Sequence, residues 1–235
     1  MTDTPTAIIT GAGSGIGRAT ARALAAAGYA VVLVGRDEAK LHETQAMIDG
    51  ANTPTLVIAA DITSRDECKH VIDSTYAAME NLTALANVAG YAALLPISEV
   101  TEATWRATID TNLSAIVHLT AAAWPLLAKQ GGTIVNVSSM ASINPFPNFA
   151  IYAAAKAAVN MFTRCTSAEG AKKKIKAVAV APGAVETQML RSMFNEKMIP
   201  KSKALSPEDV AKIIADCITG ARAYTSGETI EVPSP

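Results

Sequence analysis

Short apolar runs alternate with longer segments of helical apolar spacing from one end of the chain to the other. Some of these runs, such as Val31–Val34, are apolar at every position, which is typical of strands buried on both faces of a parallel sheet. The pattern predicts seven strands, namely Thr6–Thr10, Ala30–Gly35, Thr55–Ala59, Ala84–Val88, Thr133–Val137, Lys176–Ala181 and Thr229–Val232. Between the strands, patterns typical of helices begin near Gly15, Asp37, Ser64, Thr104, Ile151 and Pro207.

The alternation of strands and helices indicates how the elements are connected. A strand, a helix and a further strand predict a right-handed β-α-β unit. A series of such units predicts an α/β fold, with a doubly wound and predominantly parallel Rossmann-type sheet covered by helices on both faces. With 235 residues, 50% of them hydrophobic, the chain can bury one large core. No low-complexity linker or repeat divides the sequence, so we expect a single domain over residues 1–235.

Charge and cysteine content narrow the class of protein. The net charge of −1 gives no reason to expect a nucleic acid or an acidic membrane surface as partner. Cys68, Cys165 and Cys217 are far apart, which suits reduced thiols in the cytoplasm and argues against disulfides or a zinc site. We expect neither a signal peptide nor a membrane span, because the N-terminus lacks a basic region and Arg22 and Gly28 interrupt the apolar segment 19–34.

A glycine-rich turn, Thr10-Gly-Ala-Gly-Ser-Gly-Ile-Gly17, follows the first predicted strand and opens the first predicted helix. Glycines in this position let the backbone turn sharply and approach a pyrophosphate, whose charge then lies at the helix N-terminus. A nucleoside-triphosphate P-loop is excluded, because Arg18 and Ala19 follow where lysine and serine or threonine are required. The turn therefore indicates a dinucleotide site, with a tight turn that binds no ligand as the alternative.

The end of the second predicted strand bears on which dinucleotide binds. An acidic residue that accepts the adenosine ribose hydroxyls is often found at the position of Gly35, and Arg36 follows it here. A guanidinium can pair with a 2′-phosphate through two hydrogen bonds, which favours NADP(H). Asp37 keeps NAD(H) open, because its carboxylate could accept a ribose hydroxyl. Arg36, Asp37 and Glu38 could also form a solvated helix N-terminus without a ligand.

Candidate chemistry lies in the second half of the chain. Tyr152 and Lys156 are four residues apart in a predicted helix, so their side chains share one face, and Ser139 lies thirteen residues before the tyrosine. An ammonium beside a phenol favours the phenolate. Lowering a tyrosine pKa from about 10 to about 7 requires roughly 4 kcal/mol of stabilisation. A hydroxyl and an acidic phenol directed at one oxygen could polarise a carbonyl and protonate it without a metal.

Taken together, these motifs resemble those of the short-chain dehydrogenase/reductase family over residues 5–232. The matching segments are Thr10–Gly17, Asp61-Ile62, Asn87-Val-Ala-Gly90, Asn112, Ser138-Ser139, Tyr152-Ala-Ala-Ala-Lys156 and Pro182-Gly183 with Thr187. The resemblance implies an oxidoreductase that transfers a hydride between nicotinamide and a carbonyl or alcohol.

The family resemblance also implies a role for each matching residue. Tyr152 would be the acid or base, Lys156 would lower the tyrosine pKa and hold the nicotinamide ribose, and Ser139 would bond the substrate oxygen. Asn112, in the middle of a helix, would organise a water that links Lys156 to solvent. Thr187 would bond the nicotinamide carboxamide, and Asp61 and Ile62 would contact the adenine. The implied cofactor-binding residues are Gly11, Ser14, Gly15, Ile16, Gly17, Arg36, Asp61, Ile62, Asn87, Gly90, Tyr152, Lys156, Pro182, Gly183, Val185 and Thr187.

The chain departs from the family pattern in two places. Val88 stands where a second asparagine is commoner, and the ending Ser226–Pro235 lacks the usual Asp-Gly-Gly, a tail that often helps to form a subunit interface in relatives. By resemblance, residues 184–206 would form a substrate loop. This loop carries Met189, Leu190, Met193, Phe194, Met198 and Ile199, which suit either an adaptable apolar lid or an ordinary amphipathic helix. With Ile143, Phe146 and Phe149 also expected at the pocket, they predict a moderately apolar ketone or aldehyde substrate.

Other features leave alternatives. Helices equivalent to Thr104–Leu127 and Ile151–Ala168 pair subunits in relatives, so we expect a homotetramer or dimer. Lys172–Lys176 could bind a carrier protein but is more typical of a solvated loop. A dinucleotide-binding sensor without catalysis is the alternative function, and the complete set of Asn112, Ser139, Tyr152 and Lys156 argues against it. His42, His70 and His118 have no ligand partner at useful spacing, so no metal site is predicted.

Overall fold

The computed structural model describes residues 4–48 and 53–235. Residues 1–3 and 49–52 lie outside the described part of the chain. The first of these segments belongs to the N-terminus for which no signal peptide is expected. One seven-stranded sheet forms the centre of the molecule, with the strand order β3-β2-β1-β4-β5-β6-β7 and every neighbouring pair parallel. The strands are β1 (Thr6–Thr10), β2 (Ala30–Gly35), β3 (Thr55–Ala59), β4 (Ala84–Asn87), β5 (Gly132–Val137), β6 (Ile175–Pro182) and β7 (Thr229–Val232).

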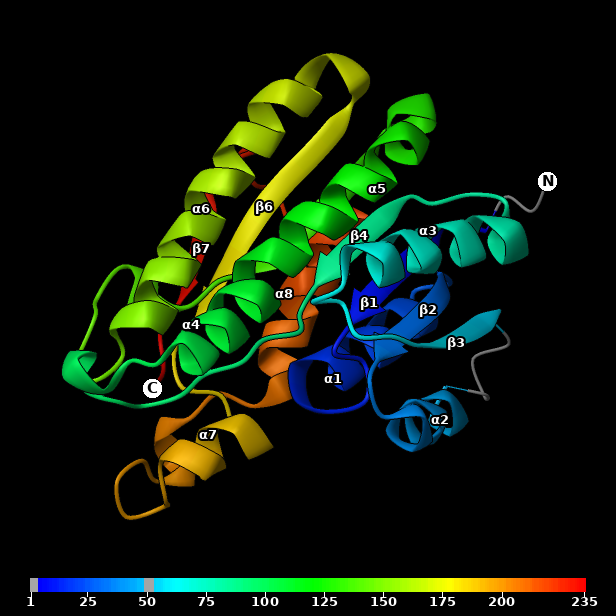
Figure 1. The fold of residues 1–235 in the computed structure, drawn as a ribbon. Helices are drawn as coiled ribbons and strands as arrows, with labels where there is room; N and C mark the ends of the chain where they lie inside the picture. Colours follow the sequence, from blue (N-terminus) through cyan, green and yellow to red (C-terminus); the bar gives the residue numbers. More distant parts are fainter. Residues whose placement is uncertain (1–3, 49–52) are drawn as a thin grey trace.

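The predicted α/β fold with a doubly wound parallel sheet is confirmed, and each predicted strand is present to within one residue at either end. Figure 1 shows helices on both sides of the sheet. They are α1 (Gly15–Ala26), α2 (Glu38–Ala46), α3 (Arg65–Met79), α4 (Glu102–Ile109), α5 (Ala115–Gln130), α6 (Ala150–Gly170), α7 (Gln188–Met193) and α8 (Pro207–Thr219).

Alternate residues of a strand point to opposite faces of the sheet, and the two faces have separate cores. In β1, Ala7 and Ile9 belong to the core cluster that also contains Leu24 of α1 and Ile214 of α8. Ile8, between them, belongs to the cluster built from α3 and α5. Because both faces are covered, the strands are apolar at nearly every position, as the sequence pattern predicted.

The helix expected to run from Thr104 to Leu127 is divided in the structure. α4 begins at Glu102, where the Thr101 hydroxyl caps it by accepting a hydrogen bond from the Thr104 amide (3.2 Å). A π-helical turn, Asp110–Ser114, separates α4 from α5. Within this turn the Asn112 amide donates to the Thr108 carbonyl (2.8 Å), so a side chain takes part in the helical hydrogen bonding. In the described residues no helix is long and apolar enough to cross a membrane.

Candidate active site

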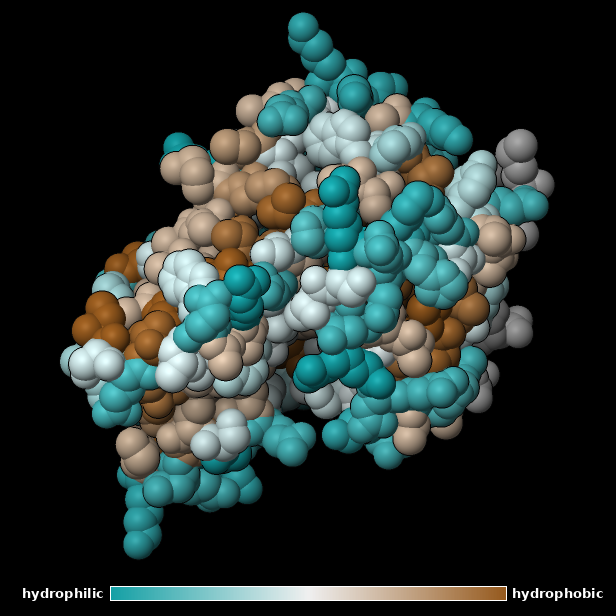
Figure 2. Space-filling model, in the orientation of Figure 1, coloured by the Kyte–Doolittle hydropathy of each residue, from teal (hydrophilic) through white to brown (hydrophobic). Residues whose placement is uncertain are grey.

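A cavity of about 750 Å³ lies at the carboxyl ends of the parallel strands. β1 and β4 are neighbours in the sheet, and the connections that follow them lead to opposite faces, which opens a crevice at this edge. Figure 2 shows the surface hollowed between the part formed by α7, at the lower left, and the part formed by α1 and α2. Residues from the glycine-rich turn, the ends of β2 to β6 and the segment around α7 line the cavity.

The glycine-rich turn is packed too closely for side chains. A Cβ on Gly17 would lie 2.2 Å from the Gly11 carbonyl oxygen, and Gly11 and Gly15 have φ angles of +67° and +49°. Ser14, the N-cap of α1, makes no capping hydrogen bond through its side chain. The first amides of α1 therefore face the cavity without a side-chain acceptor, an arrangement that fits a pyrophosphate. All five turn residues named as cofactor contacts (Gly11, Ser14, Gly15, Ile16 and Gly17) line the cavity.

Arg18 fixes the turn to α2. The sequence pattern did not predict this role. The Arg18 guanidinium donates to the Gly13 carbonyl (2.6 Å), to the Thr44 hydroxyl (3.0 Å) and to the Glu43 carboxylate (2.8 Å). Thr44 in turn donates to the Ala12 carbonyl (2.9 Å). Arg18 is therefore committed to the scaffold, which leaves Arg36 and Lys40 as the cations that line this end of the cavity in the described residues.

Arg36 and Asp37 have different surroundings. Asp37 is the N-cap of α2, and its carboxylate accepts a hydrogen bond from the Lys40 amide (3.2 Å) and pairs with the Lys40 ammonium (3.4 Å). The hydrogen bond from the Lys40 backbone holds the pKa of Asp37 below its ordinary value. Arg36 lines the cavity at the end of β2. The carboxylate considered as a ribose acceptor is thus engaged in capping a helix.

The part of the cavity expected to hold the adenine includes Asp61 and Ile62, which follow β3. The Asp61 carboxylate accepts hydrogen bonds from the Thr63 amide (3.1 Å) and hydroxyl (2.8 Å), so its orientation is set locally. On the other side of the crevice, the Thr10 hydroxyl accepts from the amides of Val88 (2.9 Å) and Ala89 (3.0 Å). Thr10 thereby fixes the segment after β4 against the glycine-rich turn.

Asn87 and Asn112 do not line the cavity; both side chains are buried behind its wall. The Asn87 amide donates to Asn136 (2.8 Å), which donates to Thr163 of α6 (2.9 Å). Asn112 donates to the Tyr91 carbonyl (2.7 Å), and its oxygen accepts from the Tyr91 amide (3.2 Å). These asparagines therefore hold the motif of Gly90 in place, and Gly90 itself lines the cavity.

Three polar side chains converge on the cavity from two elements. Ser139 follows β5, where its hydroxyl accepts from the Ala141 amide (3.1 Å) and hydrogen-bonds with Tyr152. Tyr152 and Lys156 lie one turn apart on α6, with the ammonium nitrogen 5.6 Å from the centre of the phenol ring. Lys156 is 2% exposed and donates to the Val137 carbonyl (2.8 Å). Of the four predicted catalytic residues, Ser139, Tyr152 and Lys156 are thus brought together at one wall, and Asn112 lies behind it.

The expected lowering of the tyrosine pKa is not what the protein alone gives. Burial raises the pKa of Tyr152 to about 12, while the hydrogen bond with Ser139 acts in the opposite direction. Burial also lowers the pKa of Lys156 to about 7. Leaving water disfavours the charged form of each group, and this outweighs the attraction of ammonium for phenolate that the spacing suggested. The phenol is therefore protonated near neutral pH.

The side of the cavity where the substrate is expected is formed by two segments. The segment after Ser139 contributes Phe146 and Phe149, and the region of α7 contributes apolar residues on one side of a short helix. The lining residues on this side are Met140, Asn144, Phe146, Phe149, Gln188, Met189, Leu190, Met193, Phe194 and Ile199. Ile143 and Met198, also expected here, are 39% and 61% exposed and lie outside the lining. Met140, Asn144 and Gln188 were not anticipated.

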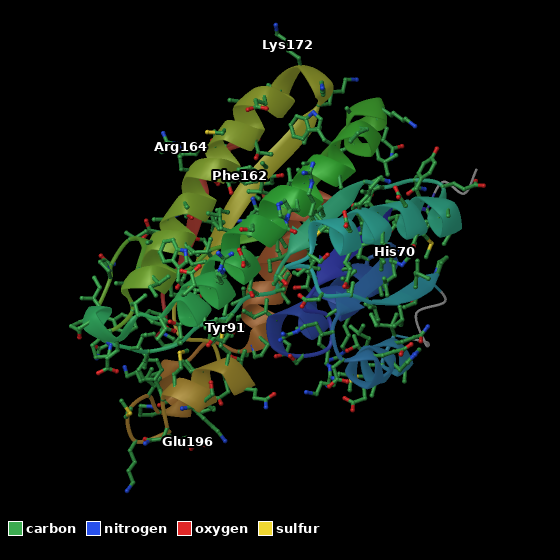
Figure 3. All side chains as sticks on the ribbon, viewed as in Figure 1. His70, Tyr91, Phe162, Arg164, Lys172 and Glu196 are labelled. Carbon is green, nitrogen blue, oxygen red and sulfur yellow. The ribbon has the colours of Figure 1, made fainter. Side chains whose placement is uncertain are left out.

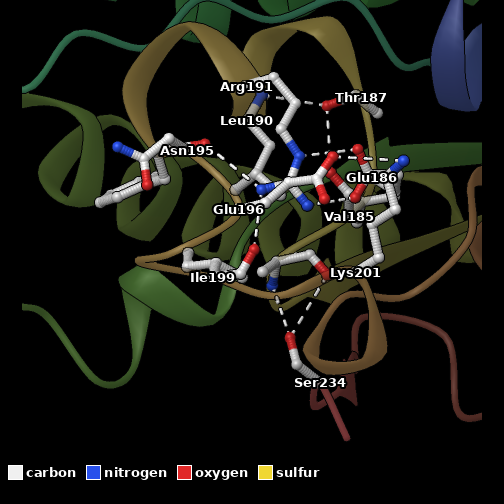
Figure 4. Close-up of polar contacts among 12 residues, drawn as sticks. Val185, Glu186, Thr187, Leu190, Arg191, Asn195, Glu196, Ile199, Lys201 and Ser234 are labelled. Carbon is white, nitrogen blue, oxygen red and sulfur yellow. Dashed lines mark hydrogen bonds and ion pairs between the residues drawn. The ribbon is translucent and has the colours of Figure 1, made fainter.

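The predicted substrate loop is tied together by Arg191 (Figure 4). Its guanidinium pairs with the Glu186 carboxylate and donates to the Ile199 carbonyl (2.8 Å), which joins the beginning of the loop to its end. At the base of the loop, the Leu205 amide donates to the Ala184 carbonyl (2.9 Å). Ser234, from the segment after β7, accepts from the Ala184 amide (2.7 Å). Hydrogen bonds thus join the two ends of the loop to each other and to the segment after β7.

The remaining dinucleotide candidates surround this base. Pro182, Gly183, Val185 and Thr187 all line the cavity. Thr187 is the N-cap of α7, and its methyl group lies 3.1 Å from where a Cβ on Gly15 would be. The loop therefore begins directly against the glycine-rich turn.

The lysine run and the histidines lie away from the cavity. Figure 3 shows Lys172 at the far end of α6 from Tyr91 and Glu196. Since α6 has 21 residues, its two ends are about 30 Å apart. Lys173 and Lys176 pack over the rings of Trp124 and Tyr224, with nitrogen-to-centre distances of 5.5 and 6.0 Å. None of the three histidines is among the residues that line the cavity.

Comparisons with known proteins agree with this geometry. A family model described as short chain dehydrogenase matches residues 5–198, which confirms the resemblance. The chain is 34% identical over 232 residues to a 3-oxoacyl-(acyl-carrier-protein) reductase from Synechocystis sp., with 96% of this chain and 94% of that protein covered. It is 33% identical to 3beta-hydroxysteroid dehydrogenase 1 from Eggerthella lenta, with 97% and 91% covered. A crystal structure of 3-ketoacyl-(acyl-carrier-protein) reductase from Brucella melitensis, complexed with NADH, superposes with a TM-score of 0.90 at 29% identity, covering 97% and 96%.

Proposed function

The chain belongs to the short-chain dehydrogenase family of oxidoreductases, and on this premise we propose that it is an NADPH-dependent reductase of ketones or aldehydes, with Tyr152 as the proton donor. The observation that carries the proposal is the convergence of Ser139, Tyr152 and Lys156 on the wall of a cavity whose opposite end begins at the glycine-rich turn. A cavity of about 750 Å³ has room for a dinucleotide with a small carbonyl compound.

When bound, the nicotinamide cofactor supplies the hydride that reaches the carbonyl carbon. Tyr152 gives its phenolic proton to the carbonyl oxygen, and Ser139 donates a hydrogen bond to the same oxygen. Lys156, close to the phenol ring, holds the nicotinamide ribose and in its charged form stabilises the phenolate that is left. Tyr152 carries this proton before the reaction, because burial raises the pKa of its phenol to about 12.

The preference for NADP(H) is supported by the two residues after β2. Arg36 lines the cavity where the adenosine ribose is expected, whereas Asp37 is engaged with Lys40. A 2′-phosphate would gain a charge-assisted contact with Arg36, and Lys40 adds a second cation at this end. NAD(H) remains the alternative cofactor, and the structural relative named above was crystallised with NADH.

We propose a moderately apolar substrate, because methionines and phenylalanines dominate the lining on the substrate side. The carrier-protein relatives suggest a carbonyl carried on an acyl chain. The lysine run at the far end of α6 does not support such a partner, since its distance from Tyr152 is about 30 Å along the helix. We also propose a homo-oligomer, tetramer or dimer, located in the cytoplasm; the three free cysteines are consistent with a reducing compartment.

The test is a titration of the purified protein with NADPH and NADH, followed by turnover assays on a panel of carbonyl compounds. We expect NADPH to bind roughly ten-fold tighter, or more, because of the Arg36 contact. Arg36→Ala should remove this preference, whereas Arg22→Ala on the outer side of α1 should keep it. Tyr152→Phe should bind both dinucleotides but lose roughly 100-fold or more in kcat.

Each outcome decides between the two functional classes. If the protein binds dinucleotide and reduces no carbonyl of the panel, the catalytically silent sensor is the better description. Equal binding of both dinucleotides, or tighter NADH binding, would overturn the role proposed for Arg36 and leave the chemistry intact. Failure to bind either one would overturn the proposed function as a whole.

A further inference from the structure

An unbroken series of aromatic rings leads from the proposed proton donor to the substrate loop. The rings of Tyr152 and Phe149 have their centres 4.5 Å apart, and those of Phe149 and Phe146 are stacked at 4.7 Å. Phe194, from the end of α7, meets Phe146 with its ring centre at 6.3 Å and its plane tilted by 60°. Every member of this aromatic wall, which consists of Phe146, Phe149, Tyr152 and Phe194, also lines the cavity.

The segment that carries two of these rings is held in place by the rest of the protein. Asn148, between them, has a left-handed backbone conformation with φ +66°, which asparagine tolerates better than most residues. Its carbonyl accepts a hydrogen bond from the Leu95 amide (2.9 Å), which ties the segment to the chain after β4. Phe149 is buried at 6% exposure, whereas Phe146 is 42% exposed. The aromatic wall is therefore buried next to Tyr152 and exposed at Phe146.

The rest of the substrate side matches an uncharged aromatic guest. Met140, Met189 and Met193 line the same part of the cavity, and thioethers make favourable contacts with aromatic rings. Among the described residues that line the cavity, the ionisable ones other than the two at the catalytic centre are Arg36, Asp37, Lys40 and Asp61. All four belong to the adenosine end. A sulfonate, phosphate or carboxylate on the substrate would therefore have no cation to receive it at the outer end.

We propose that Phe146 and Phe194 form a specificity-determining subsite for a neutral, flat ring next to the reacting carbonyl, so that the preferred substrates are aryl ketones or aryl aldehydes. This rests on the proposed reductase function. With the carbonyl oxygen at Tyr152 and Ser139, an attached ring extends along the wall towards Phe146. There the open face of Phe146 stacks on the ring, and the tilted Phe194 meets its edge or face from the loop.

The test compares kcat/KM for 2-acetonaphthone and for 2-butanone, both with NADPH or the dinucleotide that binds tighter. We expect the wild type to prefer the naphthyl ketone, and Phe194→Ala and Phe146→Ala each to reduce the ratio of the two kcat/KM values by roughly five- to ten-fold. Phe194→Leu keeps apolar volume without an aromatic face and should recover only part of the ratio. Met198→Ala is the matched control, since Met198 lies in the same loop but outside the lining.

A second readout measures binding alone. The product alcohol, 1-(2-naphthyl)ethanol, should bind the wild type with its dinucleotide more tightly than it binds Phe194→Ala, whereas 2-butanol should not distinguish them. If both ketones are reduced and the ratio is unchanged in both alanine variants, the aromatic subsite is wrong and the reductase function stands. A full recovery in Phe194→Leu would also overturn it, because apolar volume alone would then explain the preference. If no ketone or aldehyde is reduced by the wild type, the proposed function itself has failed.

Discussion

At the scale of single residues, Lys156 carries the strongest electrostatic constraint in the site. Its ammonium is almost fully buried and has one hydrogen bond, to the Val137 carbonyl at 2.8 Å. Burial lowers its pKa from the ordinary value of 10.5 to about 7. Between these two pH values the unfolded chain binds more protons at this lysine than the folded protein does. The free energy of unfolding therefore rises with pH between about pH 7 and the ordinary pKa of 10.5. Below about pH 7 the lysine is protonated in both states and adds no pH dependence.

This gives a prediction for Lys156→Met. The free energy of unfolding of the wild type should rise between about pH 7 and pH 10 relative to that of the variant, because only the wild type buries a neutral amine formed in this range. Urea unfolding at several pH values measures the difference. Lys212→Met, which changes an exposed lysine on α8, should run parallel to the wild type. If the curves of wild type and Lys156→Met are parallel as well, Lys156 is charged in the folded protein throughout this range.

Contacts between residues that are close in the sequence could be predicted, whereas contacts between residues far apart in the sequence could not. Tyr152 and Lys156 share a helix, so their spacing alone places them together. Arg18 and Thr44 are 26 residues apart, and Thr10 and Val88 are 78 apart, and no periodic pattern connects either pair. In the protein without a dinucleotide, burial raises the pKa of Tyr152, and the lowering expected from Lys156 together with a bound cofactor stays a prediction. Sequence shows the neighbouring charge but not the burial that outweighs it.

At the scale of elements, the predicted substrate loop, residues 184–206, is held in shape by side-chain contacts. Its helix, α7, has only six residues, which is too short to be stable by itself. The Arg191 guanidinium compensates by joining Glu186, Phe194 and Ile199 within one loop. Arg191 therefore holds the middle of the loop together, while backbone hydrogen bonds of Leu205 with Ala184 and Glu186 join its two ends to each other.

We predict that Arg191→Gln loosens this loop with little loss of global stability. The free energy of unfolding should fall by about 1 kcal/mol, because the contacts are local. The KM for the carbonyl substrate should rise by roughly ten-fold, since the loop no longer holds the substrate side in place. Limited proteolysis should cut within residues 186–204 faster than in the wild type. Arg106→Gln, which removes an exposed arginine–glutamate pair on α4, is the control and should change none of these values. An unchanged KM together with unchanged proteolysis would contradict the clamp.

The strands were predictable because burial on both faces leaves continuous apolar runs, and the helix boundaries were less so. The expected start at Thr104 was late by two residues, since the actual cap is the Thr101 hydroxyl. An amphipathic helix was one of two alternatives for the segment that contains α7, but the bounds Gln188–Met193 were not predicted, because six residues carry too short a pattern. The division between α4 and α5 could not be foreseen either, since it follows from the contact of Asn112 with Tyr91, twenty-one positions earlier.

At the scale of the whole molecule, the face formed by α4, α5 and α6 is a candidate for contact with other copies of the chain. Met161 on α6 is 55% exposed and Trp105 on α4 is 46% exposed. Figure 2 shows hydrophobic residues among the hydrophilic ones on the side where α5 and α6 lie. The low share of charged residues, 17%, is consistent with part of the surface being covered.

Substitutions of two exposed methionines, Met161 on the proposed interface and Met47 away from it, test whether the chain forms an oligomer through this face. We expect light scattering to give a particle about four times the 24.4 kDa of one chain, or about twice for a dimer. Met161→Arg should shift it towards the monomer, because a buried unpaired guanidinium opposes association. Met47→Arg changes an equally exposed methionine (53%) at the end of α2 and should leave the mass unchanged. A monomeric wild type would rule out the proposed assembly, and an equal effect of both substitutions would point to a general loss of solubility.

The π turn at Asp110–Ser114 also limits how the length of the chain can vary in evolution. A π turn holds one residue more than the α-helix that would replace it. Deleting one residue here would let α4 and α5 join as a continuous α-helix with nearly the same relative rotation, because the π turn fits its extra residue into the rotation of the α-helix that would replace it. The wider turn that places Asn112 beside Gly90 and the Tyr91 carbonyl would be lost. Insertions and deletions among relatives should therefore collect in the connections on either side, and residues 102–130 should keep a constant length.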